Sequence, residues 1–168
     1  LHDDPLAGAF GCWKRGVSEI WSQREYKTLS PKEKARYRAN MEAAKRQREE
    51  EQAKIHAKGR EKAAAIWKKA NPATNNHPYL TRKGVKSYGL KMINKSLLVP
   101  VRDGAGTLHG LQYILSEKNL RGKDKYLLKG TAKVGHYHSI GGKPETVIYL
   151  AEGYATAATV HEATGQPV

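Results

Sequence analysis

The segment between Pro31 and Pro72 constrains the fold of this chain more than any other part of the sequence. It begins with Ser30-Pro31-Lys32-Glu33, which combines an N-cap serine, a proline in the first helical turn and a capping-box glutamate. No proline follows until Pro72, and the good helix formers Ala, Arg, Lys, Glu and Gln dominate the residues between. The pattern predicts one long helix over residues 31–70, with Gly59 as the place for a bend or a break.

This long helix is expected to be solvated over much of its length. Residues 45–52 (Lys-Arg-Gln-Arg-Glu-Glu-Glu-Gln) are polar on every side. The end of the helix, residues 63–70, carries Ile66 and Trp67 on an apolar face that can dock onto another part of the protein. Because no a/d heptad repeat is sustained, a connector or basic arm is favoured over a coiled coil.

The net charge of +14 favours a polyanionic partner, either nucleic acid or an anionic membrane. Residues 32–69 carry thirteen Lys/Arg against six Asp/Glu, and residues 82–143 carry thirteen against three. The surplus extends into a segment with the pattern of folded β structure, which favours nucleic acid over a mere basic tail. No apolar run approaches the roughly 20 residues needed to cross a bilayer, and no signal peptide is visible. We therefore expect a cytoplasmic protein without a membrane partner.

Cysteine and histidine give little sign of a metal site. Cys12 is the single cysteine, which excludes an intrachain disulfide and a cysteine-rich zinc site. The seven histidines show no metal-ligand spacing. His136 and His138 lie on one side of an expected strand and are interpreted as structural or solvated. The chain begins with Leu1 rather than Met, and we expect it to be a piece of a longer protein.

Residues 8–23 predict a β-hairpin. A Lys-Arg-Gly turn is flanked by large apolar side chains, namely Phe10, Trp13, Ile20 and Trp21. A lone hairpin is marginal in water, so this one must pack on something else. Packing and stacking on nucleobases both stay open for the tryptophans.

The second half of the chain predicts an α+β fold with a small mixed sheet. A short helical turn closed by Gly84 precedes strands at residues 96–102, 107–115, 125–129, 135–140 and 146–151. Asp103-Gly-Ala-Gly106 is a turn between the first two strands, and Pro100 indicates an edge position or a bulge. A helix over residues 154–163, ended by Gly165, completes the pattern.

Lysines and tyrosines gather around the third of these strands. Lys123, Lys125 and Lys129 are spaced to lie on one face of it, where they form a row of cations for phosphate. A solvated edge strand protected by lysines is the alternative interpretation. Three tyrosines are interleaved with this charge, and base stacking and core packing both stay open for them: Tyr113, Tyr126 and Tyr137.

Four short motifs follow one another in the second half of the chain. They are Tyr79-Leu-x-x-Lys-Gly84, Leu97-Leu-Val-Pro-Val-Arg102-Asp103, Lys125-Tyr126-Leu and the apolar run Val147–Leu150 that leads into Ala-Glu152-Gly153. In this order and spacing they resemble the catalytic core of bacterial (DnaG-type) primases. The resemblance is greater to the phage- and plasmid-encoded primases and primase-helicases that share a Toprim domain. It covers residues 77–168, and the first half is similar in a looser way to the variable region of mobile-element proteins.

This resemblance implies Mg²⁺-dependent synthesis of RNA primers from NTPs on a single-stranded DNA template. The expected organisation is a hairpin region (1–28), a long basic helix as connector (29–71), a basic template-binding subdomain (72–145) and the start of a Toprim domain (146–168). A helicase domain in the same parent chain is a further expected partner.

The resemblance also implies roles for individual residues. Glu152 matches the first Toprim acid, which aids proton transfer or metal handling, and Gly153 forms the turn beside it. Asp103 and Tyr126 are expected to support the site. Arg102, Lys125 and Lys129 match basic positions of the family that would contact template or nucleotide phosphates. Lys123, Arg82 and Lys83 are further candidates for such contacts.

The match to the Toprim pattern is incomplete. Thr156 stands where the family often has Asp, and the Asp-x-Asp strand that binds Mg²⁺ is expected downstream of Val168. Glu152 alone is thus part of a metal site, so we expect this piece to bind nucleic acid without efficient catalysis or a tightly bound cofactor.

Two other functions are open to a chain with these motifs. The main alternative is a non-catalytic nucleic-acid-binding or assembly module of a mobile-element replication protein. Another Toprim enzyme, a topoisomerase or nuclease, is less favoured. Those enzymes place the glutamate strand near the start of a domain, without the strands of Arg102 and Lys125 before it.

Overall fold

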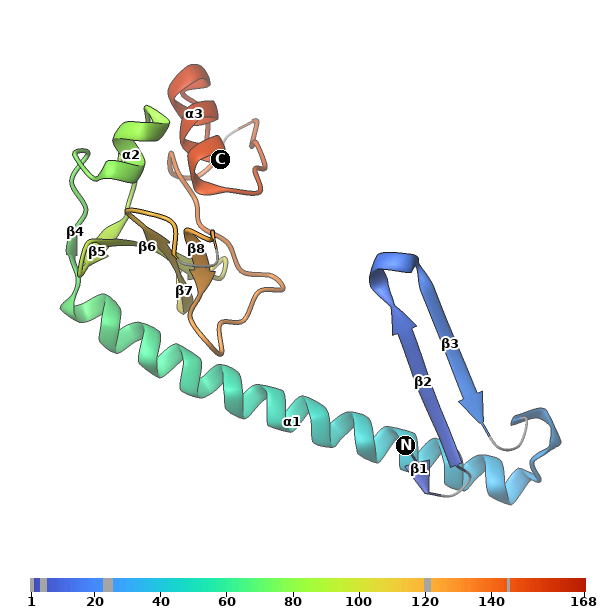
Figure 1. The fold of residues 1–168 in the computed structure, drawn as a ribbon. Helices are drawn as coiled ribbons and strands as arrows, with labels where there is room; N and C mark the ends of the chain where they lie inside the picture. The colour runs from blue at the N-terminus through green and yellow to red at the C-terminus, as the bar shows by residue number, and fades with distance from the viewer. Residues whose placement is uncertain (1, 4–5, 23–25, 120–121, 145) are drawn as a thin grey trace. The chain divides into compact units, whose positions relative to one another are not determined.

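The computed structural model describes residues 2–3, 6–22, 26–119, 122–144 and 146–168. The chain divides into two compact units, Leu1–Gln52 and Ala53–Val168, and their boundary falls inside one continuous helix (Figure 1). Each unit has its own antiparallel sheet.

The first unit contains the predicted β-hairpin. Its two long strands pair antiparallel, and Gly16, at φ 64°, completes the turn between them. A further short strand, which the sequence did not predict, pairs with the hairpin. In chain order the elements are β1 (His2–Asp3), β2 (Leu6–Cys12), η1 (Trp13–Arg15), β3 (Val17–Ser22) and η2 (Tyr26–Thr28).

The long helix α1 (Pro31–Lys69) is confirmed and runs for 39 residues without interruption. Its capping box is formed: the Ser30 amide donates to Glu33 Oε2 at 2.8 Å, and the Glu33 amide donates to Ser30 Oγ at 3.3 Å. The middle of the helix is exposed, whereas Gly59 and Ala63 near its end are buried. Gly59 therefore does not break the helix but packs against the backbone of Gly130.

The second unit is built on a five-stranded sheet in the order β4-β5-β6-β7-β8. Every neighbouring pair is antiparallel, and the sheet with its helices forms the expected α+β fold. The physical reason is that short turns join β5 to β6 and β6 to β7, and short connections permit only antiparallel pairing. The strands are β4 (Asn71–Pro72), β5 (Lys91–Ile93), β6 (Ser96–Arg102), β7 (Leu108–Leu115) and β8 (Lys125–Leu127).

Helices cover both faces of this sheet (Figure 1). On one face lie α2 (Pro78–Lys83) and α3 (Tyr154–Thr164), both of which were predicted. Each ends at a glycine in the left-handed region, Gly84 at φ 65° and Gly165 at φ 71°. The last turns of α1 lie on the other face.

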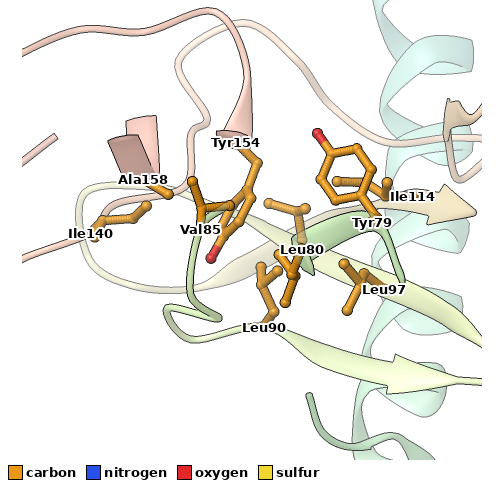
Figure 2. Packing of buried hydrophobic residues seen from close by; sticks show 10 residues of the cluster. Tyr79, Leu80, Val85, Leu90, Leu97, Ile114, Ile140, Tyr154 and Ala158 are labelled. Atoms are coloured by element: carbon orange, nitrogen blue, oxygen red, sulfur yellow. The ribbon is translucent and has the colours of Figure 1, made fainter. Parts of the chain in front are cut away.

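Two hydrophobic clusters result, one on each face of the sheet. The first is shown in Figure 2 and joins both short helices to the sheet through Tyr79, Leu80, Val85, Leu90, Leu97, Val99, Ile114, Ile140, Tyr154 and Ala158. The second joins α1 to the sheet through Ala63, Ala70, Leu98 and Leu111. Because adjacent residues such as Leu97 and Leu98 fall in different clusters, the strand alternation of β6 is visible directly in the core.

Two expected strands are not formed in the described residues. At residues 135–140 only an isolated bridge joins Tyr137 to Arg102. Residues 146–151 lie outside both sheets, and the Tyr149 amide donates to the Pro167 carbonyl at 3.0 Å. The apolar residues of this second segment are exposed, with Leu150 91% accessible. The apolar pattern alone did not create a strand, because a strand also needs a neighbour along its length.

Gly59 meets a second glycine where α1 crosses the loop after β8. A Cβ atom at position 59 would lie 2.9 Å from the Gly130 Cα, closer than real Cβ contacts. Gly130 adopts φ 90°, and its carbonyl oxygen lies 2.9 Å from His56 Nδ1. The two glycines therefore allow the backbones of α1 and this loop to touch.

Alanine usually stabilises a helix relative to glycine. Because of the contact with Gly130, we expect alanine at position 59 to destabilise the protein instead. Gly59→Ala should lower the free energy of unfolding by about 1–3 kcal/mol, because the methyl group overpacks against Gly130 backbone. At exposed position 64, by contrast, Ala64→Gly should cost about 1 kcal/mol. Chemical denaturation of both variants checks the sign, and a stabilised Gly59→Ala protein would contradict the close contact.

Candidate functional site

A cavity of about 250 Å³ opens between the sheet and the start of α3. The sheet contributes residues of β6, β7 and β8, and the opposite wall comes from the loop before α3 and from its first turn. The lining residues are Val99, Val101, Gln112, Leu127, His136, Tyr137, His138, Ala151, Glu152, Gly153, Tyr154 and Ala157. Polar groups thus meet on an apolar floor, as in many ligand sites.

Glu152 lies two residues before the start of α3, but the strand that was expected to lead into it is not formed in the described residues. Glu152 is exposed, lines the cavity and directly precedes Gly153, the N-cap residue of the helix. Gly153 provides no side-chain cap, so the first turn of α3 keeps amide groups without a side-chain acceptor. The carboxylate therefore lies near the positive end of the helix dipole.

Tyr154 fixes this end of α3 to the loop before β5. Its hydroxyl donates to the Lys86 carbonyl at 2.7 Å and accepts from the Tyr88 amide, also at 2.7 Å. Burial raises the pKa of Tyr154 to about 12. Farther along α3, Glu162 accepts from the Lys86 amide at 2.8 Å. Hydrogen bonds from both ends of α3, the helix that follows Glu152, therefore hold it against residues 86–88.

His138 is one of two histidines in the cavity wall. Burial lowers its pKa below the ordinary value, the hydrogen bond to the Tyr88 carbonyl opposes this, and Arg102 adds to the lowering. Its Nε2 lies 3.1 Å from that carbonyl oxygen. The lowered pKa favours the neutral imidazole of His138, whose Nε2 donates to the Tyr88 carbonyl oxygen.

His136 is the last of three side chains that contact one another in series, after Asp103 and His109. Asp103 Oδ2 lies 2.9 Å from His109 Nε2, and the His109 ring lies against the His136 ring with centroids 4.0 Å apart. The hydrogen bond to His109 is the main cause that lowers the pKa of Asp103, followed by the Thr107 amide. Nδ1 of His136 is buried without a hydrogen-bond partner. Asp103 is therefore a turn residue that holds an imidazole.

The sequence did not predict that His136 and His138 line a cavity together with Glu152. The interpretation of these two histidines as structural or solvated stays a prediction. Their alternation on one side of the chain was the available signal. His109 had none, because its position against His136 depends on a long-range contact.

The structure distributes the predicted basic residues over two faces of the sheet. Arg102 lies on the α1 face, where its guanidinium carbon is 5.6 Å from the Trp67 ring centroid and Nη1 donates to the Gly106 carbonyl at 2.7 Å. Lys125 and Arg82 lie on the α2 face, 5.5 and 5.7 Å from the ring centroid of Tyr79. Arg102 is thus separated from the other two by the sheet.

The remaining predicted cations are exposed around β8 and α2. Lys123 precedes the strand, Lys129 follows it, and Lys83 ends α2. Because β8 ends at Leu127, Lys129 lies in the following turn rather than in one continuous row. Asp124 lies within 4.0 Å of Arg82, so part of the local negative charge is compensated.

Tyr126 projects to the opposite face of β8 from Lys125. Its ring stacks on that of Tyr113, its direct partner in the antiparallel register, with centroids 4.8 Å apart and planes within 4°. Tyr113 packs against the α1-facing cluster, and burial raises its pKa. Tyr126 itself is 48% exposed.

The cavity can donate and accept protons but does not by itself fit a metal site. Among its described lining residues Glu152 is the one carboxylate. In the part of the chain that the structure describes, no group of three or more His, Cys, Asp or Glu side chains is arranged to bind a metal. Mg²⁺ needs an octahedral set of oxygen ligands, which Glu152 and two imidazoles do not provide. None of the helices in the described ranges has the length and apolarity of a membrane span.

Comparison with known proteins finds relatives in Escherichia coli named DNA primase TraC. One is 30% identical to this chain over 159 residues, which cover 90% of the chain and 14% of that protein. Another is 29% identical over 159 residues, covering 90% of the chain and 11% of the relative. The chain thus spans about one seventh or less of these proteins. No protein-family profile matches it, and no solved structure does.

The hydrogen bonds of Tyr154 predict a specific response to alkaline pH. Since its pKa is raised to about 12, the folded state retains a proton that the unfolded state loses near pH 10. This stabilisation is present below pH 10 and is lost as the pH rises toward 12. The free energy of unfolding should therefore fall more steeply in this window for wild type than for Tyr154→Phe.

Denaturant titrations at pH 8 and at several values between 10 and 11.5 measure this difference. At pH 8 the Phe variant should already be less stable by about 1–3 kcal/mol, because the Tyr88 amide loses its acceptor. Parallel pH curves for the two proteins would contradict the assignment.

Proposed function

We propose that this chain acts in a DNA primase of the Toprim, DnaG-like type, in the part that binds single-stranded template and begins the catalytic domain. The likeness to proteins named DNA primase TraC over 90% of the chain supports a primase-related function. The proposal extends to primer synthesis from NTPs, and to a cytoplasmic protein of a phage, plasmid or other mobile element. It also includes a helicase domain as a partner.

The observation that carries the proposal is the placement of Glu152. An apolar segment leads to this carboxylate, Gly153 turns the chain, and α3 starts at the next residue. The side chain borders a cavity floored by β6, β7 and β8. This arrangement supports a role for Glu152 as a proton acceptor or electrostatic partner at a reacting phosphate.

The charge of the second unit supports template binding. Lys123, Lys125 and Lys129 are exposed on and around the edge strand β8, with Arg82 beside Lys125 across Tyr79. These side chains can contact several successive phosphates without reading base identity. We assign the primary template contact to this edge of the sheet. Arg102 ends β6, which β7 separates from the edge strand.

The Mg²⁺ of the proposed reaction requires ligands beyond the described residues. Glu152 supplies one carboxylate, and a cluster able to bind polyphosphate through metal needs more. In this proposal they belong to an Asp-x-Asp pair elsewhere in the protein. The alternative function, a nucleic-acid-binding or assembly module without catalysis, needs no such pair.

Template binding predicts a salt-dependent affinity for single-stranded DNA. The logarithm of the association constant should fall linearly with the logarithm of salt concentration. Lys125→Ala should make that slope shallower by about 0.7, since one phosphate contact is lost. Lys45→Ala, in the first unit and paired with Glu49 at 3.8 Å, is the matched control. Fluorescence anisotropy with a labelled oligonucleotide measures both, and a flat salt dependence would remove this part of the proposal.

Catalysis is tested separately through Glu152→Gln. The full-length product of the gene that encodes this chain should incorporate ribonucleotides on a single-stranded template with Mg²⁺. The substitution should lower the rate by at least about 100-fold while leaving DNA affinity unchanged, because it removes the proton acceptor but no cation. Full activity in the variant excludes the assigned role, and no activity in wild type favours the binding module.

A further inference from the structure

We propose that Tyr126 is a stacking site for one nucleobase of single-stranded nucleic acid. The inference rests on the proposed nucleic-acid binding of the second unit, and it names the place where a base is held.

The ring of Tyr126 is already held as a flat platform. Tyr113 lies directly opposite in the register, and the two rings are nearly parallel, 4° between planes and 4.8 Å between centroids. Tyr113 in turn packs on the cluster of Ala63, Leu98 and Leu111. The orientation of Tyr126 is therefore fixed before any ligand arrives, so little side-chain entropy remains to be lost on binding.

The face of the Tyr126 ring that Tyr113 does not cover can stack with the ring of a ligand. Tyr113 covers one side of Tyr126, yet 48% of the tyrosine is accessible. β8 is the edge strand of the sheet, and in the described part of the chain no strand pairs with its outer side. A planar ligand can thus continue the stack outward, which is the geometry in which nucleobases bind aromatic side chains.

The charges around the platform select a nucleic acid over other planar ligands. Exposed lysines flank the strand on both sides, Lys123 before it and Lys129 after it. The nearby carboxylate of Asp124 is directed to Arg82. A base on Tyr126 would therefore have cations along the strand for the phosphates on either side of it.

The geometry also favours a single strand. A base inside a duplex has both faces covered by its neighbours, so it cannot reach Tyr126 without unstacking. Because the contact uses the ring face, all four bases can make it and little sequence preference follows. A peptide strand added to the β8 edge is the competing occupant, but Lys123 and Lys125 at an edge oppose such pairing.

The experiment compares two oligonucleotides of equal length, one with bases and one made of abasic sites. Tyr126→Ala should weaken binding of the normal oligonucleotide roughly ten- to a hundredfold, as expected for one lost stacking contact. The abasic oligonucleotide should bind both proteins equally, and the salt slope should not change. A 2-aminopurine base should be quenched on binding to wild type and not on binding to the variant.

Three further variants keep this test independent of folding. Tyr126→Trp preserves a planar ring and should retain the affinity, whereas Tyr126→Leu keeps apolar volume without a plane and should match alanine. Tyr26→Ala is the control at another exposed tyrosine, since Tyr26 meets Tyr37 at 58° and offers no parallel platform.

Three results would overturn the stacking site. Unchanged affinity in Tyr126→Ala, with steep salt dependence retained, rejects it and leaves template binding intact. An equal loss for the abasic oligonucleotide rejects it in favour of a general effect on the edge strand, including a peptide-binding role. Absence of any binding by wild type rejects both the stacking site and the template-binding proposal.

Discussion

Side chains of β6 and β7 point alternately to two hydrophobic clusters, and most other features of the second unit follow from this alternation. Leu97 and Val99 face α2 and α3, whereas Leu98 faces α1. Both faces are thereby buried in a sheet of only five strands. The same period of two decides which polar residues meet: Gln112 and Leu127 enter the cavity, while Tyr113 and Tyr126 stack on the reverse side.

Alternation also decides on which face of the sheet each predicted cation lies. Arg102 ends the strand that floors the cavity, yet its guanidinium lies over Trp67 on the α1 side. Lys125 shares a face with the cavity but interacts with Tyr79 from α2. Basic residues that follow one another in the sequence therefore do not all lie on one positively charged surface.

Local signals predicted much of this fold. The capping box at Ser30, the glycine caps at Gly84 and Gly165 and the strands of the central hairpin are each determined within a few residues, and each is formed. The two-residue strands β1 and β4 carry no periodic pattern. Residues 147–150 are continuously apolar, yet in the part of the chain that the structure describes no strand pairs with them. The place of Glu152 just before a helix was predictable from its local motif, while the approach of His109 to His136 depends on the loop that brings residue 137 beside Arg102.

The exposed apolar segment at residues 147–150 affects how copies of the chain associate in solution. Four successive apolar side chains, Val147, Ile148, Tyr149 and Leu150, are accessible, and such a segment is a template for association between copies. The net charge of +14 opposes that association by mutual repulsion. Added salt screens the repulsion with a Debye length of roughly 10 Å at 0.1 M while leaving hydrophobic attraction intact. Raising the ionic strength therefore weakens the repulsion that keeps these apolar segments of different copies apart.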